Sequence, residues 1–362
     1  MRHSIMAIVL IMGMAGCTSI PQPNPYQYEK AIVTPTTFMA EGAQIPIKPP
    51  GKLRLSVLPV GAGNCVIMEL PIINGKTPFI INDCGSSGAG TTGWSKADTV
   101  DFINQLLDQY IVNNNFTAHV IVVVSHADID HYNILPSLNT NMVAEVYLGG
   151  LDVDYNDAMK EWVGRVQNLV GQTNIHHDLR KTLVDEIRGY QVGPYGVSFK
   201  MLTVNASTSM VDNDDKNADS IVTRLDVGEI SITNTGDATA DTILSALRNV
   251  SERGWELKTD ILVSPHHGAE SHGSNSYLVG QAFLPQMVIF SAGDRYLHPR
   301  CTSLEAYYPT KQLLNRIANY VPRVTQVAPH QVRCGRDNQY HYKQTDRNVW
   351  VTSATGLIQH TW

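Results

Sequence analysis

The strongest constraint on this chain is an apolar segment, Ala118–Val124, followed directly by Ser-His-Ala-Asp-Ile-Asp-His at residues 125–131. A continuous apolar run of this length is typical of a strand that is buried on both faces of a sheet. Two His and two Asp within six residues at the end of such a strand are costly to bury unless each finds a partner. They are typical of ligands that converge on cations. We therefore predict a metal site here, with a solvated polar loop as the simpler alternative.

Three further polar motifs also follow predicted strands. They are Thr235-Gly236-Asp237, Pro265-His266-His267-Gly268 and Tyr296-Leu297-His298-Pro299. The carboxyl ends of strands in an α/β sheet gather the functional loops. Taken alone, Asp237 is explained equally well as a turn residue or as a metal ligand. Taken alone, either histidine of the neighbouring pair is explained better as a surface residue than as a ligand. Together, however, the four motifs contain the ligands that a two-metal site requires.

Strands and helices alternate from residue 51 onward, which predicts one α/β domain over residues 51–362. Helical spacing predicts helices at Ala97–Tyr110, Thr239–Val250 and Ser303–Tyr320, and a polar helical stretch between residues 150 and 189. The other predicted strands are Leu53–Pro59, Val66–Leu70, Phe79–Asp83, Val197–Val204, Ser220–Val227, Glu229–Thr235, Asp260–Val263, Met287–Ser291 and Arg323–Val327. Asn348–Ser353 and Gly356–Thr361 predict a strand hairpin at the C-terminus.

The N-terminus has the pattern of a targeting segment. Arg2 precedes an apolar run, Ile5–Ala15, that is too short to span a bilayer, and Cys17 follows Ala15-Gly16. We predict a signal peptide over residues 1–16 and a lipidated Cys17, as in bacterial lipoproteins, with an ordinary signal peptide and an incidental Cys as the alternative. Residues 17–50 carry seven Pro and predict an extended tether. We expect an exported protein. In a Gram-negative host, residue 18, which is Thr and not Asp, favours anchoring in the outer membrane, facing the periplasm or the cell surface.

Four cysteines remain after Cys17, an even number that allows two disulfides in an oxidising compartment. Residues 66–70 and 79–83 form two predicted strands around the turn signal Asn74-Gly75. Folding about that turn places Cys65 opposite Cys84, although Pro71 and Pro78 indicate a wider loop at the tip. Cys301 and Cys334 then pair by elimination.

At this point the motifs resemble those of the metallo-β-lactamase fold hydrolases, and within them the secreted, nuclease-like domain of ComEC-type competence proteins. The resemblance covers roughly residues 53–325. It rests on Leu55–Cys65 with its Val60-Gly61-Ala62-Gly63-Asn64 turn, Ile80–Gly85, Ser125–His131, Asn217–Ser220, Thr235–Asp237, Pro265–Gly268 and Ser291–Pro299. It implies an αββα sandwich with two divalent metal ions at one edge.

The resemblance also implies a ligand set. One metal is expected on His126, Asp128 and His267, the other on Asp130, His131 and His298, with Asp237 bridging them. Asp128 stands where the wider family has His, and this harder ligand makes Mn²⁺ or Fe²⁺ plausible beside Zn²⁺.

The chain has no convincing equivalent of the family's separate third-motif His. His176 and His177 lie in the polar helical stretch and are expected at the surface. The His266-His267 pair takes that role. Successive residues leaving a strand point in opposite directions, so only one of the two is expected to bind a metal, and His267 is preferred over His266.

The expected catalytic residues are His266, Asp130 and Asp83. His266 would be the general acid for the leaving group, and Asp83 would orient the ligand histidines. The simpler interpretation of Asp83 is a residue at a strand end whose carboxylate hydrogen-bonds backbone groups. Ser220 and Arg295 are expected to contact the substrate.

These residues predict an exported, dinuclear metal-dependent hydrolase that acts on a phosphodiester. The net charge of −6 does not favour a long nucleic acid, which leaves a small or envelope-linked phosphodiester as an option. Hydrolysis of a lactone, β-lactam or thioester is one alternative, and a non-catalytic envelope lipoprotein is another. Nothing in the sequence indicates a nucleotide cofactor.

Overall fold

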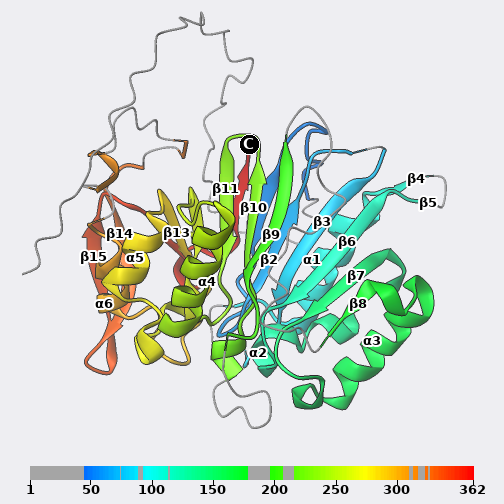
Figure 1. Cartoon of the computed structure of the whole chain (residues 1–362). Helices are drawn as coiled ribbons and strands as arrows, with labels where there is room; N and C mark the ends of the chain where they lie inside the picture. The colour runs from blue at the N-terminus through cyan, green and yellow to red at the C-terminus, as the bar shows by residue number, and fades with distance from the viewer. Residues whose placement is uncertain are drawn as a thin grey trace, which may run out of the picture.

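The computed structural model describes residues 45–73, 75–88, 93–112, 115–177, 196–206, 216–309, 313–316, 323–324 and 327–362 (Figure 1). The predicted signal peptide, Cys17 and most of the predicted tether lie outside these residues. The described part of the chain is built around two large β-sheets.

The first sheet has seven strands in the order β17-β1-β2-β3-β6-β7-β8. Their bounds are β1 (Arg54–Val57), β2 (Cys65–Glu69), β3 (Thr77–Cys84), β6 (Ala118–Val124), β7 (Val143–Leu148), β8 (Ile175–His176) and β17 (Ile358–Thr361). Strands β3, β6, β7 and β8 run parallel to one another, and the other pairings are antiparallel.

The second sheet has six strands in the order β16-β13-β12-β11-β10-β9. Their bounds are β9 (Val197–Thr203), β10 (Val222–Val227), β11 (Ile230–Asn234), β12 (Ile261–Val263), β13 (Met287–Phe290) and β16 (Asn348–Val351). Strands β9, β10 and β11 form the predicted meander, and β11, β12, β13 and β16 are parallel. Two small hairpins join β14 (His330–Arg336) to β15 (Gln339–Thr345) and β4 (Ile111–Val112) to β5 (Asn115–Phe116).

The described helices are α1 (Lys96–Asp108), α2 (Ile129–Tyr132), α3 (Asp157–Val170), α4 (Ala240–Arg253), α5 (Tyr277–Phe283), α6 (Cys301–Ala306) and α8 (Thr352–Thr355). Local sequence explains where two of them begin. Ser95 and Asp98 form a capping box at α1, and Thr239 and Thr242 form another at α4. Gly254 ends α4 in the left-handed conformation that glycine adopts without steric cost. None of the described helices is long and apolar enough to cross a membrane.

Three apolar clusters define the layers. One lies between the two sheets, and a second fills the space between the seven-stranded sheet and helices α1 and α3. The third packs α4, α5 and α6 against the six-stranded sheet, and these helices lie on the opposite side of the sheets from α3 (Figure 1). The order is helix, sheet, sheet, helix. This confirms the predicted α/β fold class and the αββα sandwich.

Strand β6 shows why its sequence is apolar throughout. Val120, Val122 and Val124 pack toward the helices, whereas Ile121 and Val123 pack between the sheets. Because alternate side chains of a strand point to opposite faces, a strand covered on both faces needs apolar residues at every position.

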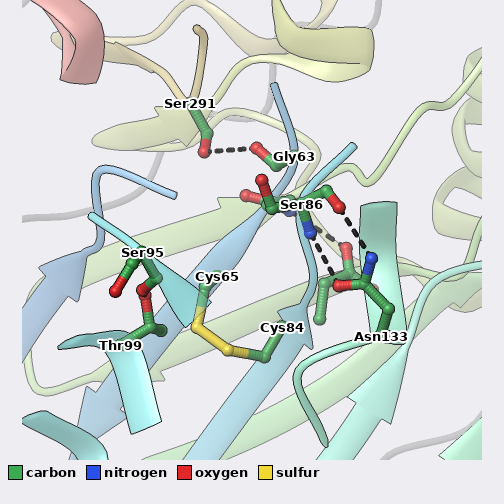
Figure 2. The surroundings of a disulfide bond; sticks show 10 residues. Gly63, Cys65, Cys84, Ser86, Ser95, Thr99, Asn133 and Ser291 are labelled. Carbon is green, nitrogen blue, oxygen red and sulfur yellow. Dashed lines mark hydrogen bonds between the residues drawn. A yellow bond between two sulfur atoms is a disulfide. The ribbon is translucent and has the colours of Figure 1, made fainter. Parts of the chain in front are cut away.

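Both predicted disulfides are present. Cys65 and Cys84 face each other in the antiparallel pairing of β2 and β3 and are bonded (Figure 2). Cys301, at the start of α6, is bonded to Cys334 of β14.

Three predictions in the last sixty residues are wrong. The helix predicted over Ser303–Tyr320 is not continuous. Helix α6 ends at Ala306, three residues before Pro309, which cannot continue the helical hydrogen bonds, and residues 313 and 314 are helical again. Residues 310–312 and 317–320 of this prediction lie outside the described residues. Residues 323, 324 and 327 are not in a strand. The predicted C-terminal hairpin is split, because β16 pairs with β13 in one sheet and β17 pairs with β1 in the other.

The sequence analysis missed six strands in the described residues. They are β4, β5, β7 and β8 of the first half, and both strands of hairpin β14–β15. Hairpin β14–β15 turns at Asp337-Asn338, and both residues have positive φ, as a two-residue hairpin turn requires. Its strands are largely polar, and Val332 and Cys334 of β14 are its buried apolar residues, too few to mark two strands by apolar alternation in the sequence.

Candidate metal centre

The predicted ligand motifs meet at one edge of the sandwich, where parallel strands of both sheets end. The 126–131 segment follows β6 of the seven-stranded sheet. Asp237 follows β11 and His267 follows β12, both in the six-stranded sheet. The site therefore lies across the two sheets, at the carboxyl ends of their strands.

Asp83 is the centre of a buried hydrogen-bond network under the site. Its carboxylate accepts hydrogen bonds from the Ser125 backbone N–H (2.6 Å), the Ser125 hydroxyl (2.9 Å) and the Asn64 amide (3.0 Å). The same carboxylate lies 2.9 Å from Nδ1 of His131. Asp83 and His131 are fully buried. The contact fixes the orientation of the His131 ring and leaves Nε2 free to face the site.

Two groups of side chains bring donor atoms within 4.8 Å of one another: His126, His131 and Asp237, and Asp130, His131 and His267. Asp237 Oδ1 lies 3.1 Å from His131 Nε2 and 3.4 Å from His267 Nε2. His267 is held from behind, because its Nδ1 lies 2.8 Å from the Ser291 carbonyl oxygen.

Four buried atoms of this cluster lack a hydrogen-bond partner among the described residues: Nε2 of His126, His131 and His267, and Oδ1 of Asp237. All four residues are at most 6% exposed. An unpaired buried polar atom costs about 1–3 kcal/mol, so four such atoms in one cluster indicate a common partner. Imidazole nitrogen and carboxylate oxygen are ligands for Zn²⁺, and the carboxylates also suit Mn²⁺. The donor set fits a divalent metal ion.

The turn after β12 has an unusual backbone. His266 and His267 both have positive φ, at 51° and 54°, and Gly268 follows at 85°. Such conformations are costly for residues other than glycine and are concentrated at functional sites. A Cβ at Gly268 would lie 2.4 Å from Pro299 Cβ, so the turn needs glycine there.

Gly236 has a comparable role in the turn before Asp237. Its φ is 52°, and a Cβ there would lie 2.4 Å from Ser125 Cβ. Glycine therefore lets the loop that carries Asp237 pack directly against the loop that follows β6.

The grouping of the ligands differs from the predicted one. His131 belongs to both close groups, whereas it was expected at one metal only. Among the described residues, neither close group includes Asp128 or His298. Asp128 lies 3.4 Å from His126 Nε2 but its side chain is 42% exposed. His298 stands at the outer side of the site, with its ring centre 6.3 Å from that of His266.

The two neighbouring histidines take different positions. His267 joins the buried cluster, while His266 is partly exposed, with Nε2 3.6 Å from Asp237 Oδ2. His176 and His177 lie elsewhere, His176 within 3.0 Å of Glu145 and stacked on Tyr147, and His177 within 3.2 Å of Asp152.

The site opens into a pocket of about 710 Å³. Its lining includes Asp128, Asp130, Asp237, His266, His267 and His298, together with Asn217, Arg295, Tyr296 and Arg300. Arg295 donates a hydrogen bond to the Ser87 carbonyl oxygen and lies over the Tyr296 ring. A pocket with a few convergent polar groups at its base is the usual arrangement of a small-molecule binding site.

Ser220 is placed differently from the expected substrate contact. It is fully buried, does not line the pocket, and its hydroxyl accepts a hydrogen bond from the Asp237 backbone N–H at 3.1 Å. Its position therefore supports the Asp237 turn.

Charges in the cluster shift its pKa values. Burial opposes ionisation of Asp237, but His267, His131 and His266 outweigh it and hold the pKa of Asp237 well below its usual value. Burial lowers the pKa of His131, yet Asp237 and Asp83 raise it well above its usual value. Burial, with the nearby His267 and His266, lowers the pKa of His298 to about 3. Carboxylates in the anionic form and a neutral His298 are the states that bind cations.

Sequence analysis missed several residues that hold or surround the cluster. They are Ser125, Asn64, Ser291 and Arg300. The Ser125 hydroxyl lies between Asp83 and the two histidines His126 and His131. Ser125 and Asn64 lie inside motifs that were recognised, but a contact through a backbone carbonyl, such as that of Ser291, leaves no side-chain signal in a sequence.

No protein-family model and no curated protein matches the chain. Among similar solved structures is Zn²⁺-bound PqqB from Methylobacterium extorquens, at 11% identity over 58% of this chain and 71% of that chain, with a TM-score of 0.32. A CmlA β-hydroxylase variant is 13% identical over 74% of this chain and 51% of its own, with a TM-score of 0.36. The short form of human tRNase Z is 12% identical over 67% and 93%, with a TM-score of 0.34. TM-scores of 0.32 to 0.36 do not establish a shared fold. The fold is therefore described from the layers of this chain, and the site from its own geometry.

Proposed function

We propose that this protein is a metal-dependent hydrolase of the metallo-β-lactamase fold, with its active site at the edge where the two sheets meet. The observation that carries the proposal is the convergence of four buried, unpartnered donor atoms from His126, His131, His267 and Asp237. A buried cluster of this composition has no evident structural use without a cation, because apolar side chains would fill the space at lower cost.

Two divalent ions, Zn²⁺ or Mn²⁺, would be held by the seven predicted ligands. These are His126, Asp128, Asp130, His131, Asp237, His267 and His298. Asp237 Oδ1 lies near Nε2 of both His131 and His267, which would suit Asp237 as a ligand shared by the two ions. His131 would bind one ion only, because its Nδ1 faces Asp83 and leaves Nε2 as the single available nitrogen. Bound metal ions of this kind lower the pKa of a coordinated water and stabilise negative charge on a reacting oxygen.

The chain's own residues orient the site and move a proton. Asp83 and the Ser125 hydroxyl fix the His131 ring, and the Ser291 carbonyl fixes His267. Asp130 faces His267 from the pocket side. His266 borders both Asp237 and the pocket, which suits it to donate a proton to a leaving group.

The proposed substrate is a phosphodiester. Arg295 and Arg300 line the pocket, and neither has a carboxylate partner among the described residues. Arg295 contacts the Ser87 carbonyl oxygen and the Tyr296 ring. A guanidinium that is not neutralised by a carboxylate is suited to recognise phosphate oxygens. The acidic net charge of the chain favours a small or envelope-linked phosphodiester over a long nucleic acid.

Export and lipid anchoring at Cys17 belong to the proposal as well. Their support is the targeting pattern of residues 1–17 together with the two disulfides, which persist in oxidising compartments.

Metal content tests the site. We expect about two metal ions per chain by elemental mass spectrometry, and fewer in His126→Ala and Asp237→Ala. His176→Gln is the matched control, because His176 lies outside the cluster and should leave the metal content unchanged. Folded protein that takes up no metal after reconstitution would contradict the hydrolase proposal and support a binding lipoprotein.

Substrate preference is tested separately on metal-loaded protein. We expect turnover of bis-(p-nitrophenyl) phosphate and not of nitrocefin. If nitrocefin is hydrolysed and bis-(p-nitrophenyl) phosphate is not, the proposed substrate changes from a phosphodiester to an acyl compound. The proposed metal site is unaffected by that result.

A further inference from the structure

One wall of the pocket is a loop without regular structure. Residues 293–300 connect β13 to α6, and five of them line the pocket: Arg295, Tyr296, Leu297, His298 and Arg300. Loops of this kind are the less ordered part of a protein unless neighbouring elements hold them. The position of this wall therefore depends on what packs behind it.

Hairpin β14–β15 packs behind the loop. The disulfide joins Cys334 of β14 to Cys301, the residue that directly follows the loop. The Gly335 backbone N–H donates a hydrogen bond to the Pro299 carbonyl oxygen at 2.9 Å, and Gly335 forms an isolated β-bridge with Arg300. The hairpin is thus attached to the C-terminal end of the loop by a covalent bond and by backbone contacts.

The approach of hairpin and loop is as close as the backbone allows. A Cβ at Gly335 would lie 2.1 Å from the Leu297 carbonyl oxygen, so glycine is required there. Any larger side chain at Gly335 has to push Leu297 toward the pocket.

Arg333 holds the other end of the loop. Its guanidinium donates a hydrogen bond to Asp294 at 2.6 Å and lies 3.5 Å from the centre of the Tyr340 ring. Tyr340 in turn donates a hydrogen bond from its hydroxyl to the Gly293 carbonyl oxygen at 3.2 Å. A planar guanidinium that is stacked on a ring and paired with a carboxylate is a rigid contact, one that Lys does not reproduce fully.

We propose that hairpin β14–β15 is the positioning element of the substrate-recognising wall, with Arg333 as its positioning residue. The wall it holds presents Arg295 and Arg300, and so takes an anionic group of the substrate. The inference rests on the proposed function for the identity of the site. The contacts between hairpin and loop belong to the fold and do not depend on catalysis.

The test compares Arg333→Leu with Arg333→Lys in the full, metal-loaded chain. Arg336→Leu is the matched control, since Arg336 lies on the same strand but pairs with Glu305, outside the loop. For Arg333→Leu we expect faster hydrogen exchange in residues 293–300, an unchanged metal content, and a KM for bis-(p-nitrophenyl) phosphate raised about tenfold with a smaller change in kcat. Arg333→Lys should recover part of both effects, and Arg336→Leu should show neither.

Gly335→Ala provides a second route to the same loop without removing a charge. It should also accelerate exchange in residues 293–300 and raise KM. If Arg333→Leu and Gly335→Ala are folded and leave both the exchange and KM at wild-type values, the positioning role is refuted.

Failure of the proposed function gives a different result. If the wild-type chain turns over no phosphodiester, the exchange rates still measure positioning, and the dissociation constant of inorganic phosphate replaces KM. A faster-exchanging loop with unchanged phosphate binding would refute the anion-recognising wall.

Discussion

At the scale of single residues, Asp83 connects the core to the candidate metal centre. It is buried, has a positive φ of 57°, and accepts hydrogen bonds from Ser125 and Asn64 while it contacts His131. Asn tolerates this backbone conformation but replaces an acceptor oxygen by an amino group. We expect Asp83→Asn to weaken metal affinity about 10–100-fold, because it removes the partner that orients His131. Metal titration measures the effect.

Asp260 is a matched control for that prediction. It too is buried, and it accepts hydrogen bonds from the backbone N–H and the hydroxyl of one serine, Ser231, at 2.9 and 2.7 Å. Asp260 lies at the start of β12, away from the ligand residues. Asp260→Asn should destabilise the fold by about 1–3 kcal/mol and leave metal affinity unchanged. If Asp83→Asn and Asp260→Asn bind metal equally tightly, the role of Asp83 is limited to accepting hydrogen bonds from the backbone.

At the scale of elements, the edge strand β17 contains a buried histidine whose two ring nitrogens have no hydrogen-bond partner in the described part of the chain. His360 is 2% exposed and stacks on Trp362, and burial lowers its pKa to about 4. The unfolded chain therefore binds a proton that the folded chain excludes between about pH 6.5 and 4. Stability from the neutral ring is complete above pH 6.5 and declines as the pH falls toward 4, by about 3 kcal/mol in total.

Replacing His360 by Leu should remove this contribution to the pH dependence. Urea unfolding at several pH values measures it, as the difference between wild-type and variant stability, since the other titrating groups are common to both. We expect the variant to gain relative to the wild type as the pH falls below 6.5. If the difference in stability between wild type and variant stays constant from pH 7 to 4, His360 takes up its proton as readily in the folded chain as in the unfolded chain.

Elements also show where sequence patterns suffice. Strand β6 and helices α1 and α4 were predicted because burial on one or two faces leaves a periodic pattern of apolar residues. Strands β16 and β17 were predicted as strands but paired wrongly, because adjacency in sequence favours a hairpin and their actual partners, β13 and β1, are distant in sequence. Hairpin β14–β15 was missed because its largely polar strands carry too few apolar residues to form a pattern.

At the scale of the whole molecule, the candidate metal centre bridges the two sheets. His126 and His131 come from the seven-stranded side, and Asp237 and His267 come from the six-stranded side. A ligand that binds only the folded chain stabilises it by about 2.7 kcal/mol at one hundred times its dissociation constant. We therefore expect Zn²⁺ or Mn²⁺ to raise the melting temperature by several degrees, and EDTA to reverse this.

Asp237→Ala should abolish the metal-dependent shift of the melting temperature. Calcium at the same concentration is the control ion, because it prefers a larger set of oxygen ligands than this cluster offers. A wild-type melting temperature that is the same with Zn²⁺, Mn²⁺ and EDTA would argue against a metal that joins the sheets.

The alternating α/β architecture, the two disulfide pairings and the presence of donors at the strand ends were all predictable from the residues. Buried strands, paired cysteines and clustered His and Asp each impose a local chemical requirement that shows in the sequence. Which donors meet depends on the packing of the two sheets, which places His131 in both groups and Asp128 and His298 outside them. Tertiary structure also decided that Ser220 supports a turn and that a polar hairpin backs the pocket wall. Those outcomes depend on how two sheets and their loops pack together, and contacts between segments distant in sequence leave no periodic signal within either one.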